Sequence, residues 1–369
     1  MKSYLLLFFT FFSFLLCGED LQKKFLPPAP KDGRFRVSDI DWPENFGDAS
    51  ICLWKDDSIA AFSLTIDDNC APDHEWWIEM GKKYELHFTW FVVTSGVSGK
   101  NSFNGSWEKF AKLVSMGHDV QSHTLTHLHG DSSNINIENE YSESKKMIEK
   151  NIPDHEVLCL AYPGGKNSNL NNTEIAMKYY IACRGTTGSV NPANKINYKN
   201  VNSLSGVINF GDAKFESQDL KFCLEKGNTR NKDLYRAWYC CHFHLTKPES
   251  RQNIEEKLKL LNGKMKTGEL WCALFSEVVK YGQERDTAVL KVLEKSKDKI
   301  VISLTDEMDD NIFNYPLTVK IRVDSSWKNA ESKQNETSSQ CRILDHNGAK
   351  YILANIIPDR GNAVIIRQN

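Results

Sequence analysis

Two adjacent carboxylates, Asp67 and Asp68, follow an apolar stretch of the sequence that begins at Ala60. Neighbouring acids repel each other, so such a pair is favoured where a cation or a proton lies beside it. A second short apolar stretch is followed by His123 and His127, and one helical turn would bring both rings onto the same face. If the two stretches are neighbouring strands, the sequence predicts a divalent metal site with an acid or a base beside it.

These residues also have simpler structural explanations. An acid pair followed by Asn69 and Pro72 is typical of a turn or a helix cap, and an isolated pair of histidines is typical of a solvated helix face. Their combination favours hydrolysis, in which one carboxylate binds the cation and the other accepts a proton from the activated water. We therefore expect the two acids to have different roles.

A third stretch of interest runs from Trp238 to His244. In an extended strand, His242 and His244 point to the same side, so both could face the interior of a barrel. A histidine at a strand end is about as often a satisfied structural group. In a barrel, one of the two imidazoles would be placed to act as general acid for a leaving group.

The elements that must position these residues alternate along the chain. Short apolar strands are expected at 60–68, 85–93, 118–122, 157–162, 181–184, 238–244, 270–275 and 299–304. Helices are expected at 72–84, 106–116, 137–150, 173–180, 218–225, 251–265 and 276–293. This alternation predicts an α/β fold whose largely parallel sheet closes into a barrel, with the active site at the C-terminal ends of the strands.

The N-terminal end has the character of a processing signal. Lys2 precedes an apolar run from Tyr4 to Leu16, which is shorter than the ~20 residues of a membrane span and predicts a secretory signal peptide. Cleavage is expected near Cys17 or Gly18. A lipid anchor on Cys17 is the lesser alternative, because Leu16 stands where a small residue is usual.

After residue 309 the pattern changes to short strands joined by polar turns, which predicts a small all-β module. These strands are expected at 317–323, 341–344, 351–356 and 363–366. The expected organisation is therefore a signal peptide at 1–18, an N-terminal extension at 19–51, the barrel at 52–308 and the β module at 309–369.

The composition is that of an ordinary enzyme-sized globular protein: 369 residues, 40% hydrophobic and 25% charged, with a formal net charge of -2. This balance of charge predicts no broad basic face for nucleic acid or for a membrane surface. No transmembrane segment is predicted, and the sequence leaves the oligomeric state open. The ten cysteines lack the C-x-x-C spacing of a zinc ribbon, and most are expected to be small core hydrophobes.

The chemically interesting motifs occur in a characteristic order. The set consists of Thr65-Ile66-Asp67-Asp68, the segment from Gly117 through His123 to His127, the loop Ala161-Tyr162-Pro163-Gly164-Gly165, and a strand ending in Phe243-His244. This ordered set resembles the polysaccharide deacetylases, the NodB homology domain of carbohydrate esterase family 4. The resemblance covers about residues 58–304, and it implies a distorted (β/α) barrel.

The resemblance also implies a role for each matching residue. Asp67 would be the general base, and His244 the general acid that protonates the departing amine or hydroxyl. Asp68, His123 and His127 would bind a divalent metal ion, usually zinc in the family and sometimes cobalt or another ion.

A third element of the resemblance is the loop of Tyr162, Pro163 and Gly164. It would supply a backbone N–H that, with the metal, stabilises the oxyanion. Gly164 stands where an aromatic residue is usual, which implies a cleft that is more open or filled from elsewhere. Ala161 stands where many members have an arginine that orients the base, and Arg184 at the end of the next strand is the residue that could supply this charge.

We therefore expect a secreted, periplasmic or cell-surface hydrolase that is metal-dependent and removes N- or O-linked acetyl groups from an acetylated carbohydrate. One alternative is an amidohydrolase that acts on a small cyclic amide with the same barrel, and the predicted export argues against it. A second alternative is a non-catalytic carbohydrate-binding member, which the departures at Ala161 and Gly164 suggest.

Overall fold

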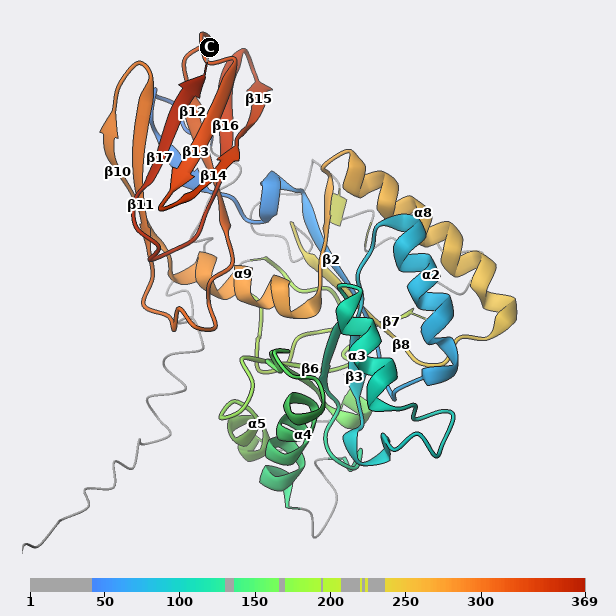
Figure 1. The fold of residues 1–369 in the computed structure, drawn as a ribbon. Coiled ribbons are helices and arrows are strands. Elements are labelled where there is room, and N and C mark those ends of the chain that lie inside the picture. The colour runs from blue at the N-terminus through green and yellow to red at the C-terminus, as the bar shows by residue number, and fades with distance from the viewer. Residues whose placement is uncertain are drawn as a thin grey trace, which may run out of the picture.

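The computed structural model describes residues 42–129, 136–165, 170–193, 195–206, 220, 223–224 and 236–368. The predicted signal peptide, Cys17, most of the N-terminal extension and most of the helix expected at 218–225 lie outside the described residues. None of the helices among these described residues has the length and apolar composition of a membrane span. The chain forms a parallel barrel with flanking helices and an antiparallel β-sandwich beside it (Figure 1).

The barrel consists of parallel strands in the order β6-β5-β4-β3-β2-β8-β7. Their bounds are β2 (Ala60–Ile66), β3 (Thr89–Val92), β4 (Asp119–Ser122), β5 (Cys159–Ala161), β6 (Ala182–Arg184), β7 (Leu204–Ser205) and β8 (Trp238–Phe243); β9 (Leu270–Cys272) pairs with the start of β2. Val201 bridges to Arg184, and β7 pairs with β8, so the segment 201–205 closes the sheet. Each of these pairings is parallel. Because the sheet is parallel and this segment closes it, the predicted α/β barrel is confirmed.

Helices follow the strands, as the alternation predicts. The helices are α2 (His74–Tyr84), α3 (Trp107–Ser115), α4 (Ile137–Asn151), α5 (Leu170–Ala176), α8 (Arg251–Lys266) and α9 (Phe275–Thr287), with short 3-10 turns η1 (Lys55–Asp57), η2 (Ala71–Asp73), η3 (Thr94–Gly96), η4 (Pro163–Gly165) and η5 (Pro248–Ser250). On α8, the buried residues Ile254, Leu258 and Leu261 recur at helical spacing and form the stripe that faces the sheet. Asn136 caps α4 by accepting a hydrogen bond from the N–H of Asn139.

The side chains of β2 are divided between two environments. Ala60, Phe62, Leu64 and Ile66 belong to the core between the sheet and the helices. The alternate positions hold small or polar side chains, among them Ser63, whose hydroxyl donates to the carbonyl of Ala273. Because side chains alternate along a strand, the same period that buries the apolar residues directs the next odd-numbered residue, Asp67, to the polar side.

The sandwich is built from two antiparallel sheets, β1-β12-β16-β15 and β10-β11-β17-β13-β14. Its strands are β1 (Ala49–Ile51), β10 (Val289–Lys295), β11 (Lys299–Thr305), β12 (Leu317–Val323), β13 (Asn329–Gln334), β14 (Thr337–Gln340), β15 (Arg342–His346), β16 (Ala349–Ile356) and β17 (Ala363–Gln368). The predicted all-β module is present. It also includes β1, β10 and β11, which lie on the N-terminal side of residue 309.

Two sequence-based expectations are wrong in this region, and two further strands were not expected. The strand expected at 299–304 as the last barrel strand is β11, which pairs antiparallel with β10 and β17. The helix expected at 276–293 ends at Thr287, and β10 follows it. β10 is an exposed edge strand, so its apolar residues carry no burial pattern that distinguishes strand from helix. β13 and β14 were not expected, because their sequences are almost entirely polar.

One apolar core joins the sandwich to the floor of the barrel. It includes Phe91 from the barrel, Phe275 and Val279 from α9, and Ile302 and Val319 from the sandwich. The ring of Phe275 packs edge-on against Phe91, with 5.5 Å between ring centroids. In Figure 1, α9 lies between the two parts of the molecule. The N-terminal end of the barrel is therefore closed by packed side chains, and the C-terminal ends of the strands lie at the other end.

Glu284 is a buried acid of α9, and both of its carboxylate oxygens accept from the N–H of Tyr315, at 3.0 and 3.1 Å. Burial, together with the nearby charge of Asp306, raises the pKa of Glu284 to about 9. The folded protein thus binds a proton that the unfolded chain releases above pH ~4.3. The stabilising contribution is complete below that pH and is lost as pH rises toward about 9.

We predict that Glu284→Gln, which is neutral at every pH, removes this pH dependence and makes the protein more stable than wild type at about pH 8. The wild-type free energy of unfolding should fall by up to about 1.4 kcal/mol per pH unit from this group. Urea denaturation at several pH values measures both slopes. Substitution of the exposed acid Glu307 by Gln is the control and should keep the wild-type slope; equal slopes in wild type and Glu284→Gln would contradict the prediction.

Candidate metal and catalytic site

The two acids that follow β2 have different backbone conformations. Asp67 continues the strand, because its N–H donates to the carbonyl of Phe243 at 2.8 Å, and its side chain is buried. Asp68 begins a run of three left-handed residues, with φ of 58° at Asp68, 66° at Asn69 and 44° at Cys70. Asn tolerates this conformation better than most residues. The tight turn directs the Asp68 side chain away from that of Asp67.

The side chain of Asn69 holds this turn in place. Its Oδ1 accepts from the N–H of Val93 at 2.8 Å, and its Nδ2 donates to the carbonyls of Val93 and Asn104. The carbonyl of Asn69 also lies 2.8 Å from Nε2 of His74. Asn69 therefore ties the acid pair to the residue that follows β3.

The two predicted metal-binding histidines lie on the loop after β4. Their expected helical turn is wrong, because the segment is an irregular loop with φ of 69° at Thr124 and 63° at His127. Glu140 of α4 holds the loop by accepting from the N–H and the hydroxyl of Thr126, at 2.8 and 2.7 Å. This loop brings the rings of His123 and His127 to 4.7 Å between centroids.

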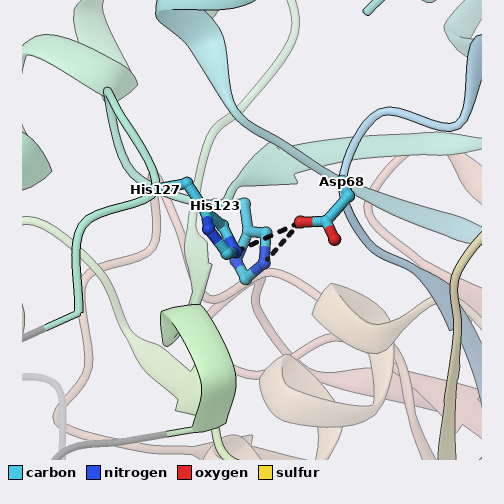
Figure 2. A group of neighbouring side chains, drawn as sticks. All are labelled: Asp68, His123 and His127. Carbon is cyan, nitrogen blue, oxygen red and sulfur yellow. Dashed lines mark ion pairs between the residues drawn. The ribbon is translucent and has the colours of Figure 1, made fainter. Parts of the chain in front are cut away.

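Asp68, His123 and His127 converge on one point (Figure 2). Nε2 of His123 and Nε2 of His127 lie 3.4 and 3.2 Å from Oδ1 of Asp68. A tetrahedral zinc site with bonds of ~2.1 Å separates its ligand atoms by about 3.4 Å. The spacing therefore fits one divalent cation between the three side chains.

The hydrogen bonds around this group give an independent test of the fit. Nδ1 of His123 lies 2.8 Å from the carbonyl of Ala161, which can only accept, so Nδ1 carries the proton and Nε2 presents a lone pair. Oδ1 of Asp68 is buried and has no hydrogen-bond partner among the described residues. Two lone-pair atoms that face each other repel unless a cation or a proton lies between them, so the donor set fits a metal ion.

The contacts also shift the protonation equilibria of the group. Burial opposes ionisation of Asp68, but its contacts with His123 and His127 lower its pKa below the usual range. The contact with Asp68 in turn raises the pKa of His127. The side chains therefore form a polarised cluster in which a negative carboxylate faces two imidazole nitrogens.

Arg184 of β6 lies against Asp67. Its Nη2 donates to Oδ2 of Asp67 at 2.5 Å, and its guanidinium lies 5.2 Å from the ring centre of Phe91. Both charged side chains are buried. Ala161 and Arg184 are partners in the pairing of β5 with β6, so the arginine supplies its charge from the next strand at the level of Ala161.

Arg184 leaves one oxygen of Asp67 free. Burial would raise the pKa of Asp67, but its surroundings, chiefly the guanidinium of Arg184, outweigh this and hold the pKa below its usual range. Oδ1 of Asp67 is buried without a hydrogen-bond partner among the described residues. Asp67 is thus ionised and oriented, with one oxygen able to accept a proton.

The two histidines of the third stretch are in different environments. His242, on β8, is buried and its Nδ1 hydrogen-bonds to Oγ of Ser203 at 2.9 Å. Burial and the charge of Arg184 lower the pKa of His242 to about 4, so it is neutral near pH 7. His244 follows the strand; its side chain is 52% exposed, and its Nε2 lies 3.5 Å from Oδ2 of Asp68. The structure therefore brings His244, and not His242, to the open side of the cluster.

The three residues predicted to stabilise the oxyanion differ in whether their backbone N–H can donate to a ligand. Tyr162 donates its N–H to the carbonyl of Arg184 and its hydroxyl to the carbonyl of Lys199, at 3.0 and 3.1 Å, so its side chain points into the core. Pro163 is buried and has no N–H. Gly164, with φ of 61°, is the remaining donor of the three.

His129 is a residue near the site that the sequence analysis missed. A Cβ added to Gly164 would lie 3.1 Å from Cε1 of His129, so this imidazole occupies the space beside the glycine. Its ring centroid is 6.0 Å from that of His127. The sequence feature that could have identified it is a third histidine on the same loop, two residues after His127.

Two comparisons with known sequences match this chain. Residues 55–180 match the family model described as polysaccharide deacetylase. A gellan lyase from a Bacillus species is 33% identical over 368 residues, an alignment that covers 94% of this chain and 14% of that protein. The chain therefore spans only a small part of the length of this relative.

Solved structures of deacetylases also match part of the chain. The Streptococcus pyogenes deacetylase PplD in complex with acetate is 22% identical, with a TM-score of 0.35 over 38% of this chain and 62% of that chain. A family 4 acetyl xylan esterase from Clostridium thermocellum in complex with a cobalt ion is 13% identical, with a TM-score of 0.38 over 59% of this chain and 89% of that chain.

We predict that Arg184→Met destabilises the fold by about 3–5 kcal/mol, because it leaves the carboxylate of Asp67 buried without its partner. The double variant Arg184→Met with Asp67→Asn should recover much of this loss, since no unpaired charge remains. Chemical denaturation of wild type, both single variants and the double variant measures the coupling. Strictly additive effects would show that the ion pair does not link the two residues.

Proposed function

The chain carries a polysaccharide deacetylase domain, and on that premise we propose that it is a metal-dependent hydrolase that removes N- or O-linked acetyl groups from a carbohydrate. The observation that carries the proposal is the convergence of Asp68, His123 and His127 beside a buried carboxylate with a free oxygen, Asp67. An imidazole, His244, lies on the open side of the same cluster. These are the groups that acyl transfer to water needs.

Asp68, His123 and His127 would hold the metal ion, which we propose is zinc, with cobalt as a substitute. Two imidazole nitrogens and one carboxylate oxygen form a common protein ligand set for catalytic zinc. When bound, the ion acts as a Lewis acid that acidifies water and polarises the acetyl carbonyl.

Asp67 is the proposed general base. Arg184 binds Oδ2, so Oδ1 is the atom that takes the proton from the attacking water. The low pKa of Asp67 keeps this carboxylate ionised at neutral pH and therefore competent to accept. Arg184 supplies the positive charge that an arginine at the position of Ala161 would supply, and it orients Asp67. This orientation supports a catalytic protein over a non-catalytic carbohydrate-binding member.

His244 is the proposed general acid. Its exposed imidazole can reach a leaving group beside Asp68, whereas the buried, neutral His242 cannot donate a proton near pH 7. The bond from the acetyl carbon to nitrogen or oxygen breaks as the proton moves from His244 to the departing atom. The N–H of Gly164 is the proposed backbone donor to the oxyanion.

The substrate is proposed from the family and from the open geometry of the site. His244 and the loop at Gly164 are accessible, and this favours an acetylated sugar chain over a small cyclic amide enclosed in a pocket. The sequence relative carries the name gellan lyase, but this chain covers only 14% of its length. Elimination by a lyase would leave unsaturated uronate products, which absorb ultraviolet light and so are distinguishable from acetate.

We predict that wild-type protein reconstituted with zinc releases acetate from N-acetylated or O-acetylated oligosaccharides. Asp68→Asn and His127→Ala should lose both bound zinc and acetate release. Asp67→Asn should keep zinc, because Asp67 is not one of the three proposed ligands, but lose turnover by about 10²–10⁴-fold, because the proton acceptor is removed. Mass spectrometry of metal content and an enzymatic acetate assay measure the two properties separately.

The matched control is His129→Ala, which removes an imidazole of the same loop outside the metal-binding group and should keep zinc. Undiminished acetate release after chelation, or in Asp68→Asn, would refute the mechanism. Ring opening of a cyclic imide without acetate release would favour the amidohydrolase alternative. Tight glycan binding without turnover in zinc-loaded protein would favour the non-catalytic one.

We also propose that the protein is exported by the signal peptide at 1–18, because Lys2 and the apolar run after it have the expected order. Protein recovered from the medium or the periplasm should begin near Cys17 or Gly18 by mass spectrometry of its N-terminal peptide. A lipid-modified Cys17 at the N-terminus would instead support the lipoprotein alternative.

A further inference from the structure

The loop that carries His244 connects β8 to η5. Of its residues, His244, Leu245 and Lys247 are exposed, whereas Thr246 is buried. An exposed loop makes few packing contacts, so the position of its side chains depends on the residue that anchors it. Thr246 is that residue, and it lies two positions after His244.

The anchor of Thr246 is Asp73, a carboxylate that is only 2% exposed. Oδ2 of Asp73 accepts from the N–H of Thr246 at 2.5 Å and from its hydroxyl at 2.8 Å. Oδ1 of Asp73 accepts from Nη2 of Arg251 at 2.7 Å. Hydrogen bonds to a buried carboxylate are stronger than those between neutral groups, so this is a firm attachment for a short loop.

Arg251 completes the attachment from the first residue of α8. Its Nε donates to the hydroxyl of Thr246 at 3.3 Å, and its guanidinium lies 5.0 Å from a ring centre of Trp76. Trp76 belongs to α2, the helix that begins directly after Asp73. The guanidinium of Arg251 therefore balances the buried negative charge of Asp73, and Trp76 of α2 packs against that guanidinium.

Asp73 also lies six residues after Asp67, on the same segment as the two acids of the site. This segment runs from the end of β2 through the left-handed turn into η2. One carboxylate thus connects the segment of the base and the metal-binding acid to the loop of the proposed general acid. The separation of 3.5 Å between Nε2 of His244 and Oδ2 of Asp68 is set across this connection.

We propose that Asp73 is a positioning residue for the reaction: it holds the His244 loop so that the imidazole can protonate a leaving group beside Asp68. The inference rests on the proposed deacetylase function. Asp73 acts through Thr246 and does not itself contact the reacting atoms.

The chemistry of the leaving group separates this role from a purely structural one. When an N-acetyl sugar is cleaved, oxygen of water bonds to the acetyl carbon and the C–N bond breaks. The nitrogen leaves only if it receives a proton, which His244 supplies while Asp67 takes a proton from the water. A nitrophenolate, by contrast, leaves as a stable anion, so hydrolysis of 4-nitrophenyl acetate needs the base but not the general acid.

The experiment compares zinc-loaded wild type with Asp73→Asn and Thr246→Val on an N-acetylated chitooligosaccharide and on 4-nitrophenyl acetate. Asp73→Asn should lower kcat for the oligosaccharide by about 10²-fold and the rate for 4-nitrophenyl acetate by less than about threefold. Thr246→Val loses one of the two hydrogen bonds to Asp73, so its kcat for the oligosaccharide should lie between those of wild type and Asp73→Asn. Thr246→Ser keeps both and should behave as wild type, and His244→Ala should show the same selective loss as Asp73→Asn.

The matched control is Asp119→Asn, which removes another buried carboxylate, at the start of β4. Asp119 accepts from Nε2 of Gln121 at 2.7 Å and from Oγ of Ser276 at 2.8 Å. It lies at the N-terminal end of its strand, whereas His244 follows the C-terminal end of β8. This variant should lose stability without changing the ratio of the two rates. Zinc content should be unchanged in every variant.

Each outcome decides the proposal. A selective loss in Asp73→Asn, graded through Thr246→Val, supports it. Equal losses on both substrates, or no loss on either, would overturn it and leave Asp73 as a structural residue. If Asp73→Asn does not fold, the ratio of the two rates in Thr246→Val decides alone. Wild type that releases acetate from neither N-acetylated nor O-acetylated oligosaccharides would defeat the proposed function itself, and this inference with it.

Discussion

The buried ion pair between Asp67 and Arg184 is the interaction on which the rest of the site depends. Arg184 is fully buried at the end of β6, over the ring of Phe91, and Asp67 is nearly as buried at the end of β2. A buried charge costs several kcal/mol unless it is paired, so each side chain is tolerated because of the other. The pair links two strands that are not neighbours in the sheet and leaves one oxygen of Asp67 facing the site.

The backbone separates the two neighbouring acids. Asp67 continues the alternation of β2 and so points to the polar side, where Arg184 lies. Asp68 begins the left-handed turn held by Asn69, which carries its carboxylate toward the histidines of the loop after β4. Two residues that would repel each other in an extended chain are thereby placed in different electrostatic environments, one against a guanidinium and one against two imidazoles. Such a division suits separate tasks in proton transfer and cation binding.

The sandwich affects the site through the other end of the barrel. Its core continues through α9 to Phe275, which packs against Phe91 on the floor of the barrel. Phe91 in turn lies against the guanidinium of Arg184. The all-β part is therefore not an appended module with a separate core, and changes in its packing can reach the buried arginine through two aromatic contacts.

The alternation of strands and helices, the strand ends that carry the acids and histidines, and the grouping of Asp68, His123 and His127 as candidate ligands could be predicted from the sequence, because periodicity and motif order are local properties of the chain. What lies opposite these residues depends instead on the three-dimensional fold. It showed that Arg184 reaches Asp67, that His244 rather than His242 faces the cluster, and that the segment 299–305 belongs to the sandwich. These outcomes depend on which strands pair and on which side chains become buried together, and contacts between residues far apart in the chain leave no mark in local sequence patterns.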